Sequence, residues 1–148
     1  MKKPILPLTY LLIAMLIVIL LHFVLPIGAL LRIPWNLLGL IPLAVGVGLN
    51  LVADRAFKTR TTTVKPFEPS TALITDGAFA VSRHPMYLGF VLILIGLGML
   101  LGSISPYIVV IVFAILMEAV FIGREEQMMA EQFGEDWQHY KARVRRWI

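Results

Sequence analysis

Long apolar runs separated by polar stretches make up most of this chain, and this pattern predicts helices that cross a membrane. Apolar side chains dominate four segments, residues 5–25, 34–53, 86–102 and 107–123. An α-helix rises about 1.5 Å per residue, so about 20 apolar residues cross a hydrocarbon layer about 30 Å thick. We therefore expect an all-α integral membrane protein, a single domain with four transmembrane helices.

The polar positions between these segments predict how the helices connect. Only the short stretch Ser103-Ile104-Ser105-Pro106 separates the third and fourth segments. Ser105 suits the N-cap of the following helix, and Pro106 suits its first position. The third and fourth helices are therefore expected to form a tight antiparallel hairpin. The second and third segments are joined by a long polar loop, residues 54–85, and long ordered loops tend to be functional.

The fourth helix is expected to project beyond the membrane, because its sequence turns polar from Glu118 onward and continues to about Phe133. Gly134 fits the stop of this helix. In the last part of the cytoplasmic tail (residues 124–148), from Glu135 to Ile148, apolar side chains at positions 137, 140 and 144 have helical spacing among several cations. A basic amphipathic segment of this kind is expected to lie on the membrane surface.

Small residues and one proline predict how the second and third helices pack. Gly89 and Gly96 are seven residues apart, so they lie on one face of the third helix, which Gly98 does not share. Small residues let helices approach closely in lipid. Pro42 lies inside the second segment and is expected to kink it, because it removes a backbone hydrogen bond.

The composition supports the membrane interpretation and excludes some chemistry. Hydrophobic residues make up 59% of the 148 residues and charged residues 15%, and the mean hydropathy of +0.85 is far above that of a soluble domain. The chain has no cysteine, which excludes disulfides and thiolate catalysis. The first apolar segment follows Lys2 and Lys3 as in a signal peptide. It is longer than a signal core and no A-x-A-like site follows it, so we expect a retained span.

The positive charges are distributed as in an oriented membrane protein. With four spans both termini lie on one side, and of the 13 Lys and Arg residues only Arg32 is expected on the other side. Cytoplasmic segments carry an excess of Lys and Arg. We therefore expect cytoplasmic termini, loop and tail, in the inner membrane if the host is a bacterium. The net charge of +4 then needs no nucleic acid to explain it.

One stretch, Arg83-His84-Pro85-Met86-Tyr87-Leu88-Gly89, combines a cation, an imidazole and a phenol at the start of the third helix. The expected hairpin places Glu125 and Glu126, from the end of the fourth helix, beside it. Carboxylates accept hydrogen bonds from ribose hydroxyls or an ammonium, arginine pairs with a carboxylate, and aromatic rings face cations. S-adenosylmethionine, an amino acid joined to a nucleoside through a sulfonium, would use all three kinds of contact.

Each of these residues also has a simpler structural interpretation. Arg83 suits a positive anchor at the membrane surface, His84 suits a helix cap, and the glutamate pair suits a solvated helix end. Glu118 is a separate candidate, because a carboxylate within or near the membrane is costly and usually functional. It lies seven residues before Glu125, which predicts the same helix face. Four roles stay open for Glu118: it pairs with a substrate amine, pairs with a structural arginine, acts as a base, or reaches water.

The chain from about residue 66 onward resembles the isoprenylcysteine carboxyl methyltransferase family and, more loosely, the phospholipid N-methyltransferases. The resemblance is carried by Asp76-Gly77-Ala78-Phe79, Arg83-His84-Pro85-Met86-Tyr87-Leu88-Gly89, Arg124-Glu125-Glu126, Phe133-Gly134, Tyr140 and Arg146-Trp147-Ile148. The family usually has proline where Ala78 stands, which concerns loop stiffness more than chemistry. The resemblance implies an integral membrane methyltransferase that binds S-adenosylmethionine on the cytoplasmic side and takes a lipophilic acceptor, a lipid or prenyl-like compound, from the bilayer.

The resemblance also implies roles for individual residues. The cofactor-binding residues would be Arg83, His84, Tyr87, Leu88, Gly89, Glu125, Glu126, Trp137 and Tyr140, with the last two closing over the cofactor. The acceptor stays open between a carboxylate, which needs no base, and an amine or hydroxyl, which must lose a proton. In the second case the base would be Glu118 or His84. No metal is implied.

Two other functions stay open at this point. Some sterol reductases carry a related R-H-P-x-Y-x-G segment and bind a nicotinamide cofactor, but they are longer and have more spans. A small membrane scaffold or transporter subunit would need no such cluster. The length of 148 residues and the Glu125-Glu126 pair favour methyl transfer over a reductase.

Overall fold

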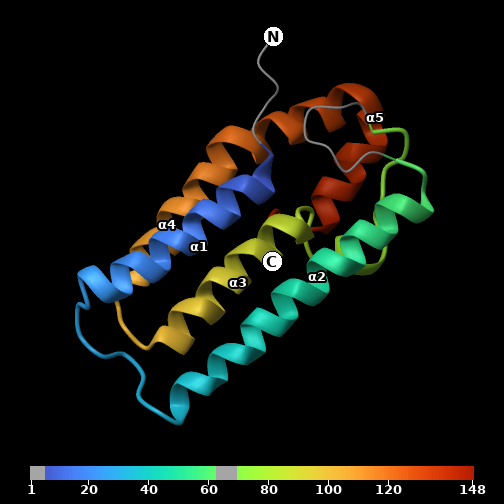
Figure 1. The fold of residues 1–148 in the computed structure, drawn as a ribbon. Helices are drawn as coiled ribbons and strands as arrows, with labels where there is room; N and C mark the ends of the chain where they lie inside the picture. The colour runs from blue at the N-terminus through green and yellow to red at the C-terminus, as the bar shows by residue number, and fades with distance from the viewer. Residues whose placement is uncertain (1–5, 63–69) are drawn as a thin grey trace.

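The computed structural model describes residues 6–62 and 70–148, which form a bundle of helices (Figure 1). The elements in chain order are α1 (Pro7–Val24), η1 (Trp35–Gly39), α2 (Leu40–Thr59), η2 (Gly77–Ala80), α3 (Pro85–Leu101), α4 (Pro106–Met117), η3 (Glu118–Ile122) and α5 (Gly123–Arg143). Two of these, η1 and η2, are 3₁₀-helices, and η3 is a π-helical turn that joins α4 to α5. The first residue of the first predicted span and part of the predicted loop lie outside the described residues.

Helix α3 lies within the bundle and packs against α2, α1 and α4 (Figure 1). Among the described residues, three helical stretches are long and apolar enough to cross a membrane, Pro7–Val24, Trp35–Thr59 and Pro106–Arg143, and α3 is apolar but shorter at 17 residues. Many leucine, isoleucine and valine side chains of α1 and α2 are exposed, which suits contact with lipid. The prediction of an all-helical membrane protein with four apolar helices is confirmed, as is the hairpin of α3 and α4.

Glycines bring α2 and α3 into close backbone contact. A Cβ atom added to Gly96 would lie 2.6 Å from the carbonyl oxygen of Gly39, and one added to Gly89 would lie 2.7 Å from that of Gly46. Real Cβ atoms are not found so close to other atoms, so glycine is required at both positions. Gly98 faces α4 instead. The prediction that Gly89 and Gly96 share a face that Gly98 does not share is therefore confirmed.

The second predicted span differs from its expected form at both ends. Because it starts with the 3₁₀-helix η1, Pro42 lies in the first turn of α2, where a missing N–H leaves no α-helical bond unmade. The kink expected at Pro42 is replaced by a change of helix type at Leu40. At its other end α2 continues to Thr59, past the predicted limit at residue 53, and Lys58 pairs with Asp54 one turn earlier at 2.5 Å.

Polar contacts join α1 to the turn between α3 and α4. Nδ1 of His22 lies 2.8 Å from the hydroxyl of Ser103. Gly102, at φ 78°, ends α3, and its carbonyl accepts the N–H of Leu30 at 2.7 Å. Ser105 takes the predicted N-cap position, but its hydroxyl donates to the carbonyl of Leu21 at 3.5 Å and caps no amide. The predicted turn and the predicted N-cap position of Ser105 are therefore present, without a side-chain capping bond.

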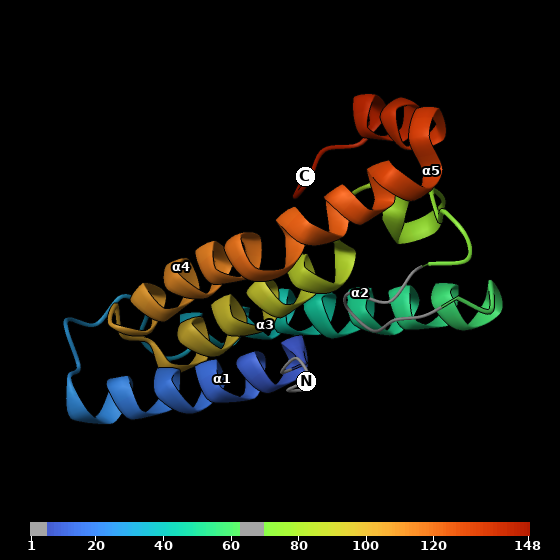
Figure 2. The same ribbon diagram turned by 90° about the horizontal axis from the view of Figure 1, so that it is seen from above.

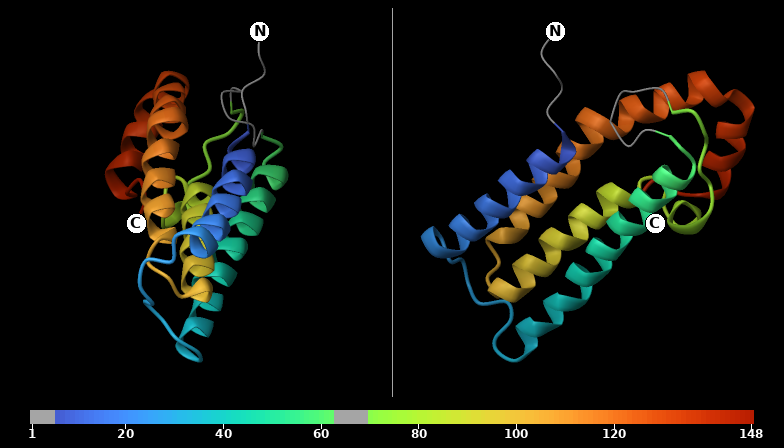
Figure 3. Two further views of the ribbon diagram at one scale, coloured as in Figure 1. Left: turned by 60° about the vertical axis from the view of Figure 1, so that its left-hand side comes forward. Right: turned by 45° about the vertical axis from the view of Figure 1, so that its right-hand side comes forward.

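The helix after the π-turn changes direction at Gly134, where the sequence predicts its stop. Gly134 has φ 49° and ψ −117°, a positive φ that favours glycine. Further helical turns follow to Arg143, and the chain returns toward the bundle (Figures 2 and 3). Trp137 and Tyr140 on this returning stretch are 3% and 2% exposed. At these two rings the apolar face of the segment is therefore covered by the protein interior, while its place at the membrane surface stays a prediction.

Candidate functional site

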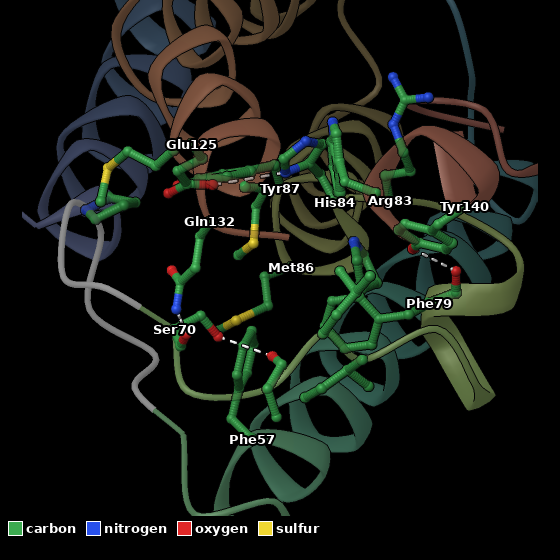
Figure 4. A pocket seen from close by; sticks show the side chains of 18 of the residues that line it. Phe57, Ser70, Phe79, Arg83, His84, Met86, Tyr87, Glu125, Gln132 and Tyr140 are labelled. Atoms are coloured by element: carbon green, nitrogen blue, oxygen red, sulfur yellow. Dashed lines mark hydrogen bonds and ion pairs between the residues drawn. The ribbon is translucent and has the colours of Figure 1, made fainter. Parts of the chain in front are cut away.

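A cavity of about 340 Å³ lies where α1 and α3 begin and α2 ends, beside α5 (Figure 4). Its volume falls within the range of small-molecule sites, about 300–1,000 Å³. Most of the lining is apolar and includes Leu8, Phe57, Met86, Phe90, Met128 and Met129. The polar lining residues include Ser70, Arg83, His84, Tyr87, Glu125, Gln132 and Tyr140. The cavity therefore joins a polar corner to an apolar wall.

The first residues of α3 build the polar corner. Pro85 occupies the first helical position and His84 the N-cap, which places the imidazole at the helix start. The N–H of His84 donates to the hydroxyl of Ser82 at 3.1 Å, and this hydroxyl donates to the carbonyl of Arg146 at 3.0 Å. The turn before α3 is thereby tied to the C-terminal residues, and His84 is buried.

Glu125 brings a carboxylate into the cavity from α5. One oxygen accepts a hydrogen bond from the hydroxyl of Tyr87 at 2.6 Å, and the other lies 3.6 Å from Nδ1 of His84. Figure 4 shows these three side chains along one side of the opening. The hairpin therefore brings the start of α3 beside Glu125 in the first turn of α5, as predicted.

Glu126, the next residue, turns into an ionic cluster behind the cavity. It pairs with Arg83 at 2.7 Å and with Arg146 at 2.6 Å, and its side chain is 7% exposed. Nε2 of His84 lies 3.4 Å from the same carboxylate. Burial raises the pKa of Glu126, but hydrogen bonds from His84, Arg146 and Arg83 outweigh burial and hold this pKa well below its usual range. Glu126 is therefore charged.

His84 stands between the two glutamates. Burial lowers the pKa of His84, but the hydrogen bonds and negative charges of Glu125 and Glu126 outweigh burial, so the pKa is raised above its usual value. The folded protein thus favours the protonated imidazole at the edge of the cavity.

Arg83 directs its guanidinium into the cluster. Besides its pair with Glu126, it donates to the backbone carbonyls of Lys141 at 3.2 Å and Val144 at 3.0 Å, and it lies 5.8 Å from the ring centre of Trp137. In Figure 4 the guanidinium points away from the opening. The group expected to pair with a cofactor carboxylate is therefore already paired with the protein.

Trp137 and Tyr140 form part of the cavity wall. Their rings meet edge to face, 5.6 Å apart, and the hydroxyl of Tyr140 donates to the carbonyl of Phe79 at 2.7 Å. Burial raises the pKa of Tyr140 to about 12, partly opposed by the charge of Arg83. This hydroxyl therefore stays protonated and joins the returning helix to η2.

Six of the predicted site residues line the cavity: Arg83, His84, Tyr87, Glu125, Trp137 and Tyr140. The other four are not among the described lining residues. Leu88 is buried, Gly89 packs against α2, and Glu126 lies in the ionic cluster. Glu118 pairs with Arg146 at 2.5 Å.

The predicted common face of Glu118 and Glu125 is wrong. The prediction assumed a regular α-helix, whereas residues Glu118–Ile122 form a π-turn, which shifts the register of everything after it. Glu118 shares Arg146 with Glu126, and Glu125 faces the cavity.

Several lining residues were not predicted. Met128, Met129 and Gln132 follow Glu125 at the spacing of one helix face, so this part of the lining could have been found from the sequence. The amide of Gln132 donates to the carbonyl of Ser70 and joins α5 to the loop. Phe57 lies on the part of α2 beyond its predicted end, so no expected helix placed it near the site.

Together these features define an integral membrane protein with a ligand-sized cavity at one end of an apolar helical bundle. The fold is shared with the eukaryotic intramembrane Ras methyltransferase, an isoprenylcysteine carboxyl methyltransferase. The two structures superpose with a TM-score of 0.70 over 95% of this chain and 51% of that chain, at 24% sequence identity.

The sequence pattern of the phospholipid methyltransferase family matches residues 35–136, and the chain belongs to this family. It is 33% identical over 75 residues to protein-S-isoprenylcysteine O-methyltransferase of Schizosaccharomyces pombe, across 49% of this chain and 30% of that enzyme. It is 36% identical over 63 residues to an uncharacterized protein of Haemophilus influenzae, across 43% of this chain and 100% of that protein. The chain therefore matches about half or less of each of the two methyltransferases, and the resemblance predicted from the motifs is confirmed.

Proposed function

We propose that this protein transfers a methyl group from S-adenosylmethionine to a lipophilic acceptor, a lipid or prenyl-like compound with a carboxylate or an amine. The observation that carries the proposal is the cavity, in which Glu125, His84 and Tyr87 form a polar corner against an apolar wall. Such a cavity suits a charged cofactor at one end and an apolar acceptor from the bilayer at the other. Membership of the phospholipid methyltransferase family supports the same reaction.

The residues of the polar corner fit the cofactor. Its sulfonium and ammonium groups are cations, and Glu125 offers a carboxylate whose side chain is 21% exposed. Protonated His84 faces Glu125 and Glu126 with its two ring nitrogens, so its role is to support the negative charge of this corner. The rings of Trp137 and Tyr140 offer flat surfaces for an adenine base. In this proposal Arg83 supports the corner from behind, through the ionic cluster.

The bound cofactor would supply a methyl carbon that its sulfonium makes electrophilic. The protein then has to hold the acceptor in line and exclude water. An amine or hydroxyl acceptor must also lose a proton. Glu125 is better placed to accept it than Glu118, because Glu118 is engaged by Arg146 outside the cavity lining. Protonated His84 would support the charge of Glu125 and would not act as the base.

We place the cavity on the cytoplasmic side of the membrane. Exposed Arg55 and Lys58 lie on the last turns of α2, at the cavity end, and Arg32 lies in the connection at the opposite end of that helix. This asymmetry agrees with the excess of cations that cytoplasmic segments carry.

Equilibrium binding to the detergent-purified protein tests the proposal. We expect S-adenosylmethionine to bind and Glu125→Gln to weaken binding about tenfold or more, because a hydrogen bond to a charged group contributes about 1.5–3 kcal/mol. Glu135→Gln, an exposed glutamate of the same helix, is the matched control and should bind as wild type. NADPH binding in place of S-adenosylmethionine would indicate a reductase, and binding of neither would indicate a scaffold. Either result would refute the proposal.

The acceptor is identified with a labelled methyl donor. The protein is incubated with labelled S-adenosylmethionine and a total lipid extract, and the products are separated and analysed by mass spectrometry. Label on an oxygen ester would identify a carboxylate acceptor, and label on nitrogen an amine. Loss of the amine product in Glu125→Gln at saturating cofactor would support Glu125 as the proton acceptor.

A further inference from the structure

The ionic cluster behind the cavity is bridged by one C-terminal arginine. Nη1 of Arg146 donates to Glu118 at 2.5 Å, and Nη2 and Nε donate to Glu126 at 2.6 Å and 3.1 Å. Two carboxylates from successive parts of one long helix thus share a single guanidinium. The indole N–H of Trp147 adds a 3.3 Å hydrogen bond to Glu118.

A regular α-helix would not bring these two carboxylates to one side. Residues 118 and 126 are eight steps of about 100° apart, which leaves them about 80° apart around the helix axis. Residues 118 and 125 would be only about 20° apart. The π-turn Glu118–Ile122 accommodates one additional residue, which removes one step from this count. Glu126 therefore takes the side of Glu118, and Glu125 turns to Tyr87 and the cavity.

We propose that Arg146 is a positioning residue, which bridges Glu118 and Glu126 across the π-turn and thereby fixes which of the two adjacent glutamates faces the cavity. Arg146 is not among the described lining residues, so it acts through Glu126, which also holds Arg83 and lies against His84. The claim that this arrangement serves S-adenosylmethionine binding rests on the proposed function. The positioning of the two glutamates is a property of the ligand-free protein.

The side chain of Arg146 can be changed without detaching the C-terminal residues. The backbone N–H of Arg83 donates to the carbonyl of Arg145 at 3.0 Å, and Ser82 donates to the carbonyl of Arg146 at 3.0 Å. Both bonds use backbone oxygens of the tail. Lysine is a useful comparison, because its ammonium keeps the charge but lacks the planar fork that meets two carboxylates together.

The first test measures the pKa of His84 by NMR in the ligand-free protein. The imidazole is faced by Glu125, Glu126 and the ring of Tyr87, and Arg83 pairs with Glu126 beside it. Arg146→Gln removes a cation from Glu126, so we expect the pKa of His84 to rise. A guanidinium that fastened the C-terminal residues without acting on Glu126 would leave this pKa unchanged.

The second test measures S-adenosylmethionine binding in the same variants. We expect Arg146→Gln to weaken binding about tenfold to a hundredfold, because a misplaced Glu125 loses a hydrogen bond to a charged group, and such a loss has an effect of this size. Arg146→Lys should weaken binding less and leave the pKa of His84 near its wild-type value. Arg145→Gln, which changes the adjacent exposed arginine, is the control and should match wild type in both measurements.

Each outcome bears on the proposal. Wild-type titration and binding in Arg146→Gln, with only a lower unfolding temperature, would overturn it. If Arg146→Gln does not fold, the lysine variant decides: weaker binding with a preserved His84 titration supports positioning, and wild-type binding overturns it. A raised His84 pKa in Arg146→Gln, in a protein that binds no S-adenosylmethionine even as wild type, would refute the proposed function, while the coupling of Arg146 to the carboxylates beside His84 would stand.

Discussion

Gly89 allows a direct test of whether a residue of the Arg83–Gly89 stretch serves packing or cofactor binding. A Cβ atom at this position would collide with Nδ2 of Asn50 and lie 2.7 Å from the carbonyl oxygen of Gly46. The amide of Asn50 can rotate, but the carbonyl belongs to the backbone of α2, so the two helices must separate. Overpacking of this kind costs about 1–3 kcal/mol, and we expect Gly89→Ala to lower the free energy of unfolding by this amount.

Unfolding in detergent, followed by circular dichroism, measures this difference. Gly48→Ala is the matched control on α2, because a Cβ there would meet nothing within 4 Å. It should unfold as wild type does or gain up to about 1 kcal/mol from helix propensity. Folded Gly89→Ala should still bind S-adenosylmethionine. Wild-type stability combined with lost binding would contradict the packing argument and restore the cofactor role predicted for Gly89.

Two further predictions concern charge. The folded protein raises the pKa of His84, so its contribution to stability is complete below the unfolded pKa of about 6.5 and is lost as the pH rises through the folded value. The unfolding temperature of wild type should therefore fall more between neutral and alkaline pH than that of His84→Gln, and equal slopes would contradict the coupling. For orientation, the cysteine-free chain allows single-cysteine labelling. A membrane-impermeant maleimide added to intact cells should label Arg32→Cys and spare Glu135→Cys, and the reverse pattern would place the cavity outside.

The features that the sequence predicted correctly follow from patterns within short segments. Apolar runs indicated the helices, the short turn before Pro106 indicated the hairpin, and the spacing of Gly89 and Gly96 indicated the face that meets α2. The π-turn could not be predicted in this way. It brings Glu118 to Arg146, which lies 28 positions later in the sequence. The register of the helix therefore depends on a long-range contact, and the spacing of apolar residues within one segment gives no information about such a contact. An assumed α-helix therefore assigned the wrong neighbour to Glu118.

The burial of Trp137 and Tyr140 shows why an amphipathic pattern alone does not distinguish a membrane surface from a protein interior. Helical spacing places apolar side chains on one face, and either lipid or protein can cover that face. Here the apolar face is covered by protein, because the positive φ of Gly134 reverses the chain and returns this stretch to the start of α3. There the carbonyl of Phe79 accepts a hydrogen bond from the hydroxyl of Tyr140. Burying this hydroxyl without a partner would lower the free energy of unfolding by about 1–3 kcal/mol. The same reversal returns the C-terminal residues to the ionic cluster, so the conformation of one glycine underlies both the cavity wall and the position of Glu125.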